Sequence, residues 1–184
     1  SRPPLEPVAA ACEILEQVRI PQGAPVAVLG DGKLGLLIAQ VLQAHGARVR
    51  LYGRHKEKMA VAESAGVETG FSNKPPRAAY DYTVEATGSG AGLSAAVAMT
   101  RARWTIVMKS TVQGAVALDT APVIVNEITL VGSRCGRFEP ALKLLRSGRL
   151  RLDEMITDQF SLKDAPRAFT RAQEPGVLKV LLWR

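Results

Sequence analysis

The sequence predicts an α/β fold: a doubly wound parallel sheet of about six strands with helices on both faces. Short apolar runs alternate with amphipathic segments, as strands and crossover helices do in such sheets. A glycine-rich turn joins the first apolar run, 25–29, to the amphipathic segment 33–45. The chain has 184 residues, enough for one domain with a buried core. We expect residues 1–151 to form this domain, opened by an N-terminal helix, and 152–184 to form a short α/β extension.

Two periodicities place the elements along the chain: three- and four-residue steps for helices, and alternation for strands. Helices are expected at 5–19, 33–45, 56–64, 91–100, 121–126, 139–147 and 164–172. Strands are expected at 25–29, 48–52, 80–86, 103–108, 128–132 and 177–182. The proline-containing segment between Phe71 and Tyr80 is expected to be a surface loop, and Asp164 is expected to cap the last helix.

The composition argues against a membrane-spanning protein, a nucleic-acid-binding protein and a structural zinc site. No apolar run reaches the ~18 residues that a membrane span needs. The net charge is +7, but the basic residues are spread along the chain and aromatic residues make up only 5%, which argues against nucleic-acid binding. Cys12 and Cys135 form no CxxC pair, so no structural zinc knot is expected. The wide separation of the two cysteines and the lack of a signal-peptide pattern favour a reducing cytoplasm.

The segment Gly30-Asp31-Gly32-Lys33-Leu34-Gly35 carries the strongest functional signal. Its glycines have the G-x-G-x-x-G spacing between a strand and a helix, which is typical of dinucleotide sites. The first glycine permits the tight turn, the second lets a diphosphate approach the backbone, and the third lets the helix sit close to the strand. The helix N-terminus then faces the phosphates with free N–H groups. The alternative is a glycine-rich βα turn that binds nothing.

The end of the second strand bears on the choice of cofactor. In NAD sites an acid stands here, about 20 residues after the glycine turn, and binds the ribose hydroxyls. This sequence has Gly53-Arg54-His55-Lys56 instead. Without a carboxylate, Arg54 and Lys56 can neutralise a 2′-phosphate, which favours NADP and argues against S-adenosylmethionine. In the alternative, Arg54 stacks on adenine and Lys56 is solvated, and NAD remains acceptable.

Two later strand ends supply further candidates. Thr87 and Gly88 follow the strand 80–86, and Lys109 and Ser110 follow the strand 103–108. Carboxyl ends of parallel strands line the ligand crevice, so these residues are expected to contact the cofactor. Lys109 is expected to contact substrate or phosphate; alternatively, it is a solvated loop residue.

The chain also resembles the cofactor-binding half of the medium-chain dehydrogenase/reductase superfamily, the zinc-type alcohol, polyol and threonine dehydrogenases. The marks of this resemblance are spread over essentially the whole chain. They are Glu6-Pro7-Val8-Ala9, the glycine turn, Glu85-Ala86-Thr87-Gly88, Ile128 to Gly132 leading into Ser133-Arg134, and Pro175-Gly176 with Lys179-Val180.

The resemblance implies a Rossmann fold, a nicotinamide cofactor and hydride transfer to or from an alcohol or carbonyl carbon. In the family, the catalytic zinc is held by an N-terminal domain that is absent here, so this chain is expected to have neither metal ligands nor catalytic residues. Glu6 would lie beside that zinc in the polyol-type branch; alternatively, it is an exposed residue of a first helical turn. The parent protein is thus expected to be an oxidoreductase, whereas this chain alone would bind cofactor without turnover.

The family pattern also implies contacts with other parts of a larger protein. Residues from about Leu152 onward would pack on the catalytic domain, and the strand Ile128–Gly132 would join two subunits in a homodimer. The competing hypothesis is a Rossmann domain that binds NAD(P) without catalysis and regulates a partner.

Overall fold

The computed structural model describes residues 5–112, 114–174 and 176–184. The strands are β1 (Pro25–Leu29), β2 (Arg48–Gly53), β3 (Glu68–Phe71), β4 (Tyr80–Glu85), β5 (Thr100–Met108), β6 (Thr129–Gly132), β7 (Asp158–Ser161) and β8 (Val180–Trp183). The α-helices are α1 (Leu5–Gln17), α2 (Lys33–His45), α3 (Lys56–Ser64), α4 (Gly90–Met99), α5 (Ala121–Val125), α6 (Phe138–Arg146) and α7 (Ala165–Ala172). Two short 3₁₀ helices, Asp153–Met155 and Leu162–Asp164, flank β7.

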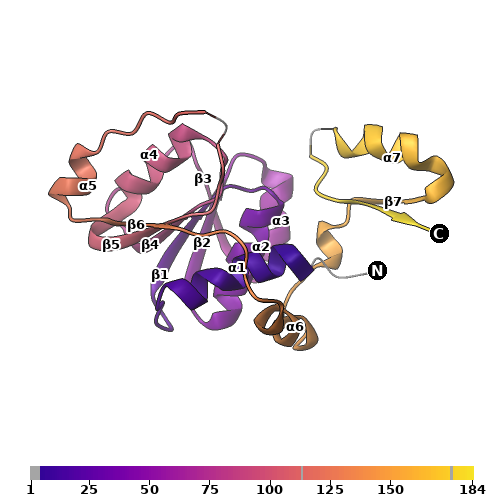
Figure 1. The fold of residues 1–184 in the computed structure, drawn as a ribbon, viewed down its shortest axis with the longest axis horizontal. Helices are drawn as coiled ribbons and strands as arrows, with labels where there is room; N and C mark the ends of the chain where they lie inside the picture. The colour runs from indigo at the N-terminus through magenta and orange to yellow at the C-terminus, as the bar shows by residue number, and fades with distance from the viewer. Residues whose placement is uncertain (1–4, 113, 175) are drawn as a thin grey trace.

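The centre of the molecule is a six-stranded sheet in the order β3-β2-β1-β4-β5-β6, with every neighbouring pair parallel (Figure 1). The chain winds outward from β1 through β2 to β3, then returns to the other side of β1 and winds outward again. The predicted doubly wound α/β fold is confirmed. The order reverses between β1 and β4, and in such sheets ligands bind outside the carboxyl ends of the strands at this point.

Two apolar layers, one on each face of the sheet, follow from the alternation of side chains along β1. Val26 and Val28 belong to a core cluster that also takes in residues of α1, α2 and α3. Ala27 and Leu29 point the other way, into a cluster with residues of α4. Successive residues of a strand face opposite sides, so a strand buried on both faces reads as a continuous apolar run.

Helix α2 is the most deeply buried helix segment, because residues 35–42 are all buried. It ends at Gly46, whose φ of 108° is a left-handed conformation that glycine adopts without strain. The helix thereby holds the glycine turn rigidly against the sheet.

The structure differs from the predicted elements at several places, among them the strand β7 (Asp158–Ser161), which the sequence analysis missed. The strand β3 was missed, because Glu68–Phe71 is an edge strand with no fully buried residue and one glycine. β5 begins at Thr100, before a shift in its pairing with β4, and Arg103 has a φ of 68°. Asp164 stands at the N-cap of α7 as predicted, but its side chain makes no capping hydrogen bond.

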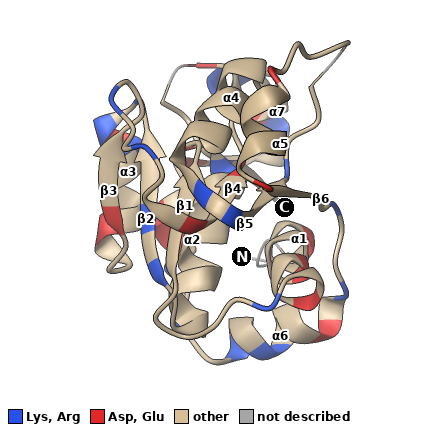
Figure 2. Cartoon of the chain, turned by 90° about the vertical axis from the view of Figure 1, so that its left-hand side faces the viewer, with Lys and Arg blue, Asp and Glu red and all other residues tan. Residues whose placement is uncertain are grey.

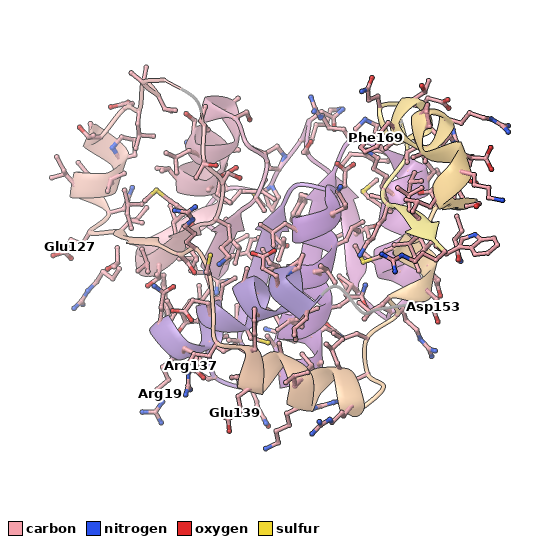
Figure 3. All side chains as sticks on the ribbon, turned by 45° about the vertical axis from the view of Figure 1, so that its right-hand side comes forward. Arg19, Glu127, Arg137, Glu139, Asp153 and Phe169 are labelled. Atoms are coloured by element: carbon pink, nitrogen blue, oxygen red, sulfur yellow. The ribbon has the colours of Figure 1, made fainter. Side chains whose placement is uncertain are left out.

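The strands β7 and β8 form a separate two-stranded parallel sheet, which α7 accompanies (yellow in Figure 1). Met155 and Leu178 anchor this C-terminal unit to the larger core cluster. Its other large apolar side chains are exposed: Phe169, labelled on α7 in Figure 3, is 65% exposed, and Trp183 is 57% exposed.

The +7 charge is distributed over the fold. Figure 2 shows Lys and Arg on helices, strands and loops, with Asp and Glu placed among them. Within the described ranges, no helix is both long and apolar enough to cross a bilayer.

Leu42→Ala should lower the free energy of unfolding by about 2–5 kcal/mol, because Leu42 is fully buried on α2 and its loss leaves a cavity. The matched control is Leu142→Ala on α6, where the side chain is 39% exposed and the loss should be within about 1 kcal/mol. Urea unfolding of both variants measures the difference, and equal losses would contradict the assigned core.

Candidate dinucleotide site

A cavity of about 400 Å³ opens at the carboxyl ends of β1, β2 and β4, where the strand order reverses. Its walls come from the glycine turn, the β2–α3 corner and the first turn of α4. The lining residues are Leu29, Gly30, Asp31, Gly32, Tyr52, Gly53, Arg54, His55, Lys58, Ser72, Ala86, Thr87, Ser89, Ala91, Gly92 and Ala95.

The three glycines of the turn meet three different spatial demands. A Cβ on Gly30, whose φ is +115°, would lie 2.5 Å from the carbonyl oxygen of Ala86, so only glycine fits there. A Cβ on Gly35 would lie 2.0 Å from the carbonyl oxygen of Gly30, so α2 rests directly on the turn. A Cβ on Gly32 would meet nothing within 4 Å, which leaves open space in front of the turn.

The N-terminus of α2 faces this open space without a side-chain cap. Gly32 is its N-cap residue and has no side chain to accept from the first-turn N–H groups, so these groups are left for another acceptor. In contrast, the N-cap of α4 is Ser89, whose hydroxyl accepts a hydrogen bond from the Gly92 N–H at 3.1 Å. Of these two helix starts, α2 is the one shaped for an anion such as a diphosphate.

The side chain of Asp31 reaches from the turn to the β2–α3 corner. Its Oδ2 accepts hydrogen bonds from the backbone N–H groups of Arg54 and His55, both at 2.7 Å. The His55 Nδ1 lies 2.9 Å from the same oxygen. An ionised carboxylate only accepts, so Nδ1 carries the hydrogen in this contact.

These contacts keep Asp31 ionised. Burial alone would raise the pKa of Asp31, but the backbone N–H groups of His55 and Arg54 and the His55 ring outweigh it and lower the pKa below 3.8. The site therefore holds a fixed negative charge at neutral pH.

The position of Asp31 changes the physical basis for predicting NADP. The strand end does carry glycine at position 53, as the sequence shows, but a carboxylate arrives at the same place from the glycine turn. A Cβ on Gly53 would lie 2.6 Å from the Asp31 Cβ and 2.7 Å from its Oδ2. Arg54 and Lys58 line the same cavity and bring positive charge. The strand end, from which the sequence predicts NADP, therefore does not by itself decide between NADP and NAD.

The opposite wall is held by Glu85, which is buried at the end of β4. Its Oε1 accepts hydrogen bonds from the Thr87 N–H at 2.7 Å and the Thr87 hydroxyl at 2.6 Å. The Gly88 N–H donates to the Ser110 hydroxyl at 2.8 Å, which ties the end of β4 to the end of β5. Thr87 is thus fixed in the cavity wall, whereas Ser110 supports the loop behind it.

Lys109 is buried at the end of β5 and does not line the cavity. Its ammonium donates to the Ser133 hydroxyl at 3.0 Å and to the Arg134 carbonyl at 2.5 Å. Burial lowers the pKa of Lys109, and the carboxylate of Glu13 opposes that shift in part. The solvated-loop alternative for Lys109 is wrong, since only 7% of the residue is exposed.

The structure brings half of the predicted site residues together in the cavity wall: Gly30, Asp31, Gly32, Gly53, Arg54, His55 and Thr87. The others stand behind or beside it: Lys33, Leu34, Gly35, Lys56, Gly88, Lys109 and Ser110. Sequence reasoning missed Tyr52, Lys58, Ser72, Ser89 and Gly92 as lining residues. Lys58 could have been found, because it lies four residues after Arg54 at the start of a predicted helix.

Among the residues that the structure describes, no group of three His, Cys, Asp or Glu side chains could hold an ion. Glu6 is exposed on the first turn of α1, and the cysteines are unpaired, with Cys12 buried and Cys135 exposed.

Comparison with known proteins shows similarity to dehydrogenases. The family model for zinc-binding dehydrogenases matches residues 34–147, more than half of the chain. The chain belongs to the zinc-binding dehydrogenase family. A sorbitol dehydrogenase of Halalkalibacterium halodurans is 26% identical over 96% of this chain and 57% of its own length.

Among the solved structures that share the fold of this zinc-binding dehydrogenase chain are two whose descriptions name a bound cofactor. One, described as a zinc-binding dehydrogenase from Sinorhizobium meliloti 1021 bound to NADP, has a TM-score of 0.89 at 24% identity and covers 98% of this chain and 58% of its own. The other, a short chain alcohol dehydrogenase from Escherichia coli CFT073 complexed with NADH, has a TM-score of 0.87 at 19% identity with the same coverage. The chain spans less than two thirds of the length of these relatives.

Asp31→Asn should destabilise the fold at neutral pH by about 1–3 kcal/mol, because hydrogen bonds to a charged acceptor are weakened. Folding lowers the pKa of Asp31, so its contribution is complete above the unfolded value of 3.8 and is lost as the pH falls through the lower folded value. Urea unfolding of both proteins between neutral pH and about pH 3 should show the difference shrinking in acid. A difference that stays constant over this range would contradict the ionised contact.

Proposed function

We propose that this chain is the NAD(P)-binding part of an oxidoreductase that transfers hydride to or from an alcohol or carbonyl carbon. The observation that carries the proposal is the open space before Gly32, facing an uncapped α2 at the point where the strand order reverses. Family membership favours this function over a non-catalytic sensor.

The residues divide the work of holding a dinucleotide. The first-turn N–H groups of α2 would bind the diphosphate, with the positive end of the helix dipole adding to the attraction. The β2–α3 corner, with Asp31, Arg54 and Lys58, would hold the adenosine half. Thr87 would wall the other side of the crevice. When bound, the nicotinamide supplies or accepts the hydride, and the protein positions its reacting carbon.

Nearby charges act in opposite directions on the binding of NADP. Arg54 and Lys58 supply the positive charge that a 2′-phosphate would need, in line with the predicted preference for NADP. The carboxylate of Asp31 stands beside them and opposes a second anion.

The substrate proposal rests on the relatives. Similarity to a sorbitol dehydrogenase supports a small alcohol or polyol, or the matching carbonyl compound. The zinc that the family name implies would need ligands other than the described residues of this chain.

Two surfaces would complete a larger enzyme. The exposed Phe169 and Trp183 of the C-terminal unit, residues 152–184, would pack on a catalytic domain. The edge strand at Ile128–Gly132, beside the exposed Ile124 and Val125, would pair with a second subunit to form a homodimer. The unpaired cysteines suit a cytoplasmic protein.

Calorimetric titration of the chain with NAD, NADP and S-adenosylmethionine tests the proposal. We expect a nicotinamide dinucleotide to bind with a dissociation constant of about 1 µM to 1 mM, as is usual for enzyme ligands. Gly32→Ala should weaken binding at least about tenfold, because its methyl group would occupy the space that a diphosphate needs.

The control is the stability of the Gly32→Ala variant. The added Cβ meets nothing within 4 Å, so urea unfolding should stay within about 1 kcal/mol of the wild-type chain. Preference for S-adenosylmethionine, or unchanged dinucleotide affinity in the folded variant, would refute the proposal.

A further inference from the structure

The β2–α3 corner contains an anion site that the protein fills with its own side chain. Two consecutive N–H groups, those of Arg54 and His55, point to one place at the N-terminus of α3. Such paired amides at a helix start attract anions. The Oδ2 atom of Asp31 sits there and is 2.7 Å from both nitrogens.

The Asp31 carboxylate also occupies the volume of a side chain from position 53. The 2.6 Å separation between a Cβ on Gly53 and the Asp31 Cβ means that the two side chains cannot coexist without movement. In dinucleotide folds, an acid at the end of this strand binds the adenosine ribose hydroxyls. Position 53 carries glycine in this chain, but a carboxylate still lies at the end of β2. Asp31 of the glycine turn supplies it in place of a residue at position 53.

We propose that Asp31 acts as the ribose-binding acid of this site and makes it select NAD over NADP. This inference rests on the proposed function, because it concerns the adenosine half of the same dinucleotide. Oδ2 is held by Arg54 and His55, while Oδ1 accepts no hydrogen bond from the residues that the structure describes (5–112, 114–174 and 176–184). Oδ1 is therefore the acceptor for a ribose hydroxyl.

The fixed carboxylate opposes the attraction that Arg54 and Lys58 exert on a phosphate. A 2′-phosphate would replace that hydroxyl with a dianion next to Asp31, and it could not reach the Arg54 and His55 N–H groups while Asp31 holds them. Asp31 is only 7% exposed and is fixed by three contacts. Arg54, in contrast, is exposed, so water screens its attraction for a phosphate.

Calorimetric titration of the 184-residue chain with NAD and NADP tests the inference. The wild-type chain should bind NAD at least about tenfold more tightly than NADP, and Asp31→Asn should reduce that ratio at least about tenfold by removing the repelling charge. ADP-ribose and its 2′-phosphate should give the same ratios, because the discriminating atoms lie on the adenosine half.

Asp81→Asn is the charge-matched control. Asp81 lies near the amino end of β4, away from the cavity at the carboxyl ends of the strands, and accepts a hydrogen bond from Arg101. Its loss should leave the NAD-to-NADP ratio unchanged. A second variant, Asp31→Gly with Gly53→Asp, returns the acid to the strand end and should keep the preference for NAD, so the inference stays testable even if Asp31→Asn does not fold.

The outcomes separate the two proposals. NADP binding as tightly as NAD to the wild-type chain, or an unchanged ratio in folded Asp31→Asn, would overturn the role of Asp31 and leave the proposed function standing. Failure of both dinucleotides to bind the wild-type chain would overturn the proposed function, and this inference with it.

Discussion

The contact between three backbone segments at the glycine turn is the constraint on which the rest of the structure depends. Gly30 lies so close to Ala86 that the end of β1 touches the end of β4, and Gly35 brings α2 onto the Gly30 carbonyl. Any side chain at either position would push the helix or the neighbouring strand away. Because both contacts are made by backbone, the turn has one geometry, and the N-terminus of α2 faces the crevice between β1 and β4.

The hydrogen bonds of Asp31 add a second constraint to these close backbone contacts. The same residue that continues the turn closes the β2–α3 corner through Arg54 and His55. Its carboxylate is buried, yet the N–H groups around it keep it charged. One side chain thus links the helix that faces the diphosphate position to the corner that faces the adenosine position. A substitution that moves Asp31 should therefore alter both the diphosphate position and the adenosine position.

The order of strands and helices could be predicted from the sequence because apolar runs and glycine positions are local signals. The doubly wound sheet, α2 with its stop at Gly46, and five strands of the six-stranded sheet (β1, β2, β4, β5 and β6) rest on such signals. The edge strand β3 could not be predicted, because Glu68–Phe71 has neither alternation nor a buried residue. The hydrogen bonds of Asp31 could not be predicted either. Its partners Arg54 and His55 lie 23 and 24 residues later in the chain and approach it only when β1 and β2 pair.

The central claim is that the uncapped turn at 30–35 binds a diphosphate through its backbone N–H groups. Amide chemical-shift mapping of the ¹⁵N-labelled chain during titration with ADP-ribose tests it most directly. We expect the largest shifts at the amides of Gly32, Lys33 and Leu34, with smaller shifts at Arg54 and His55. Saturable binding whose largest shifts lie elsewhere, such as at the β7–β8 sheet, would contradict it.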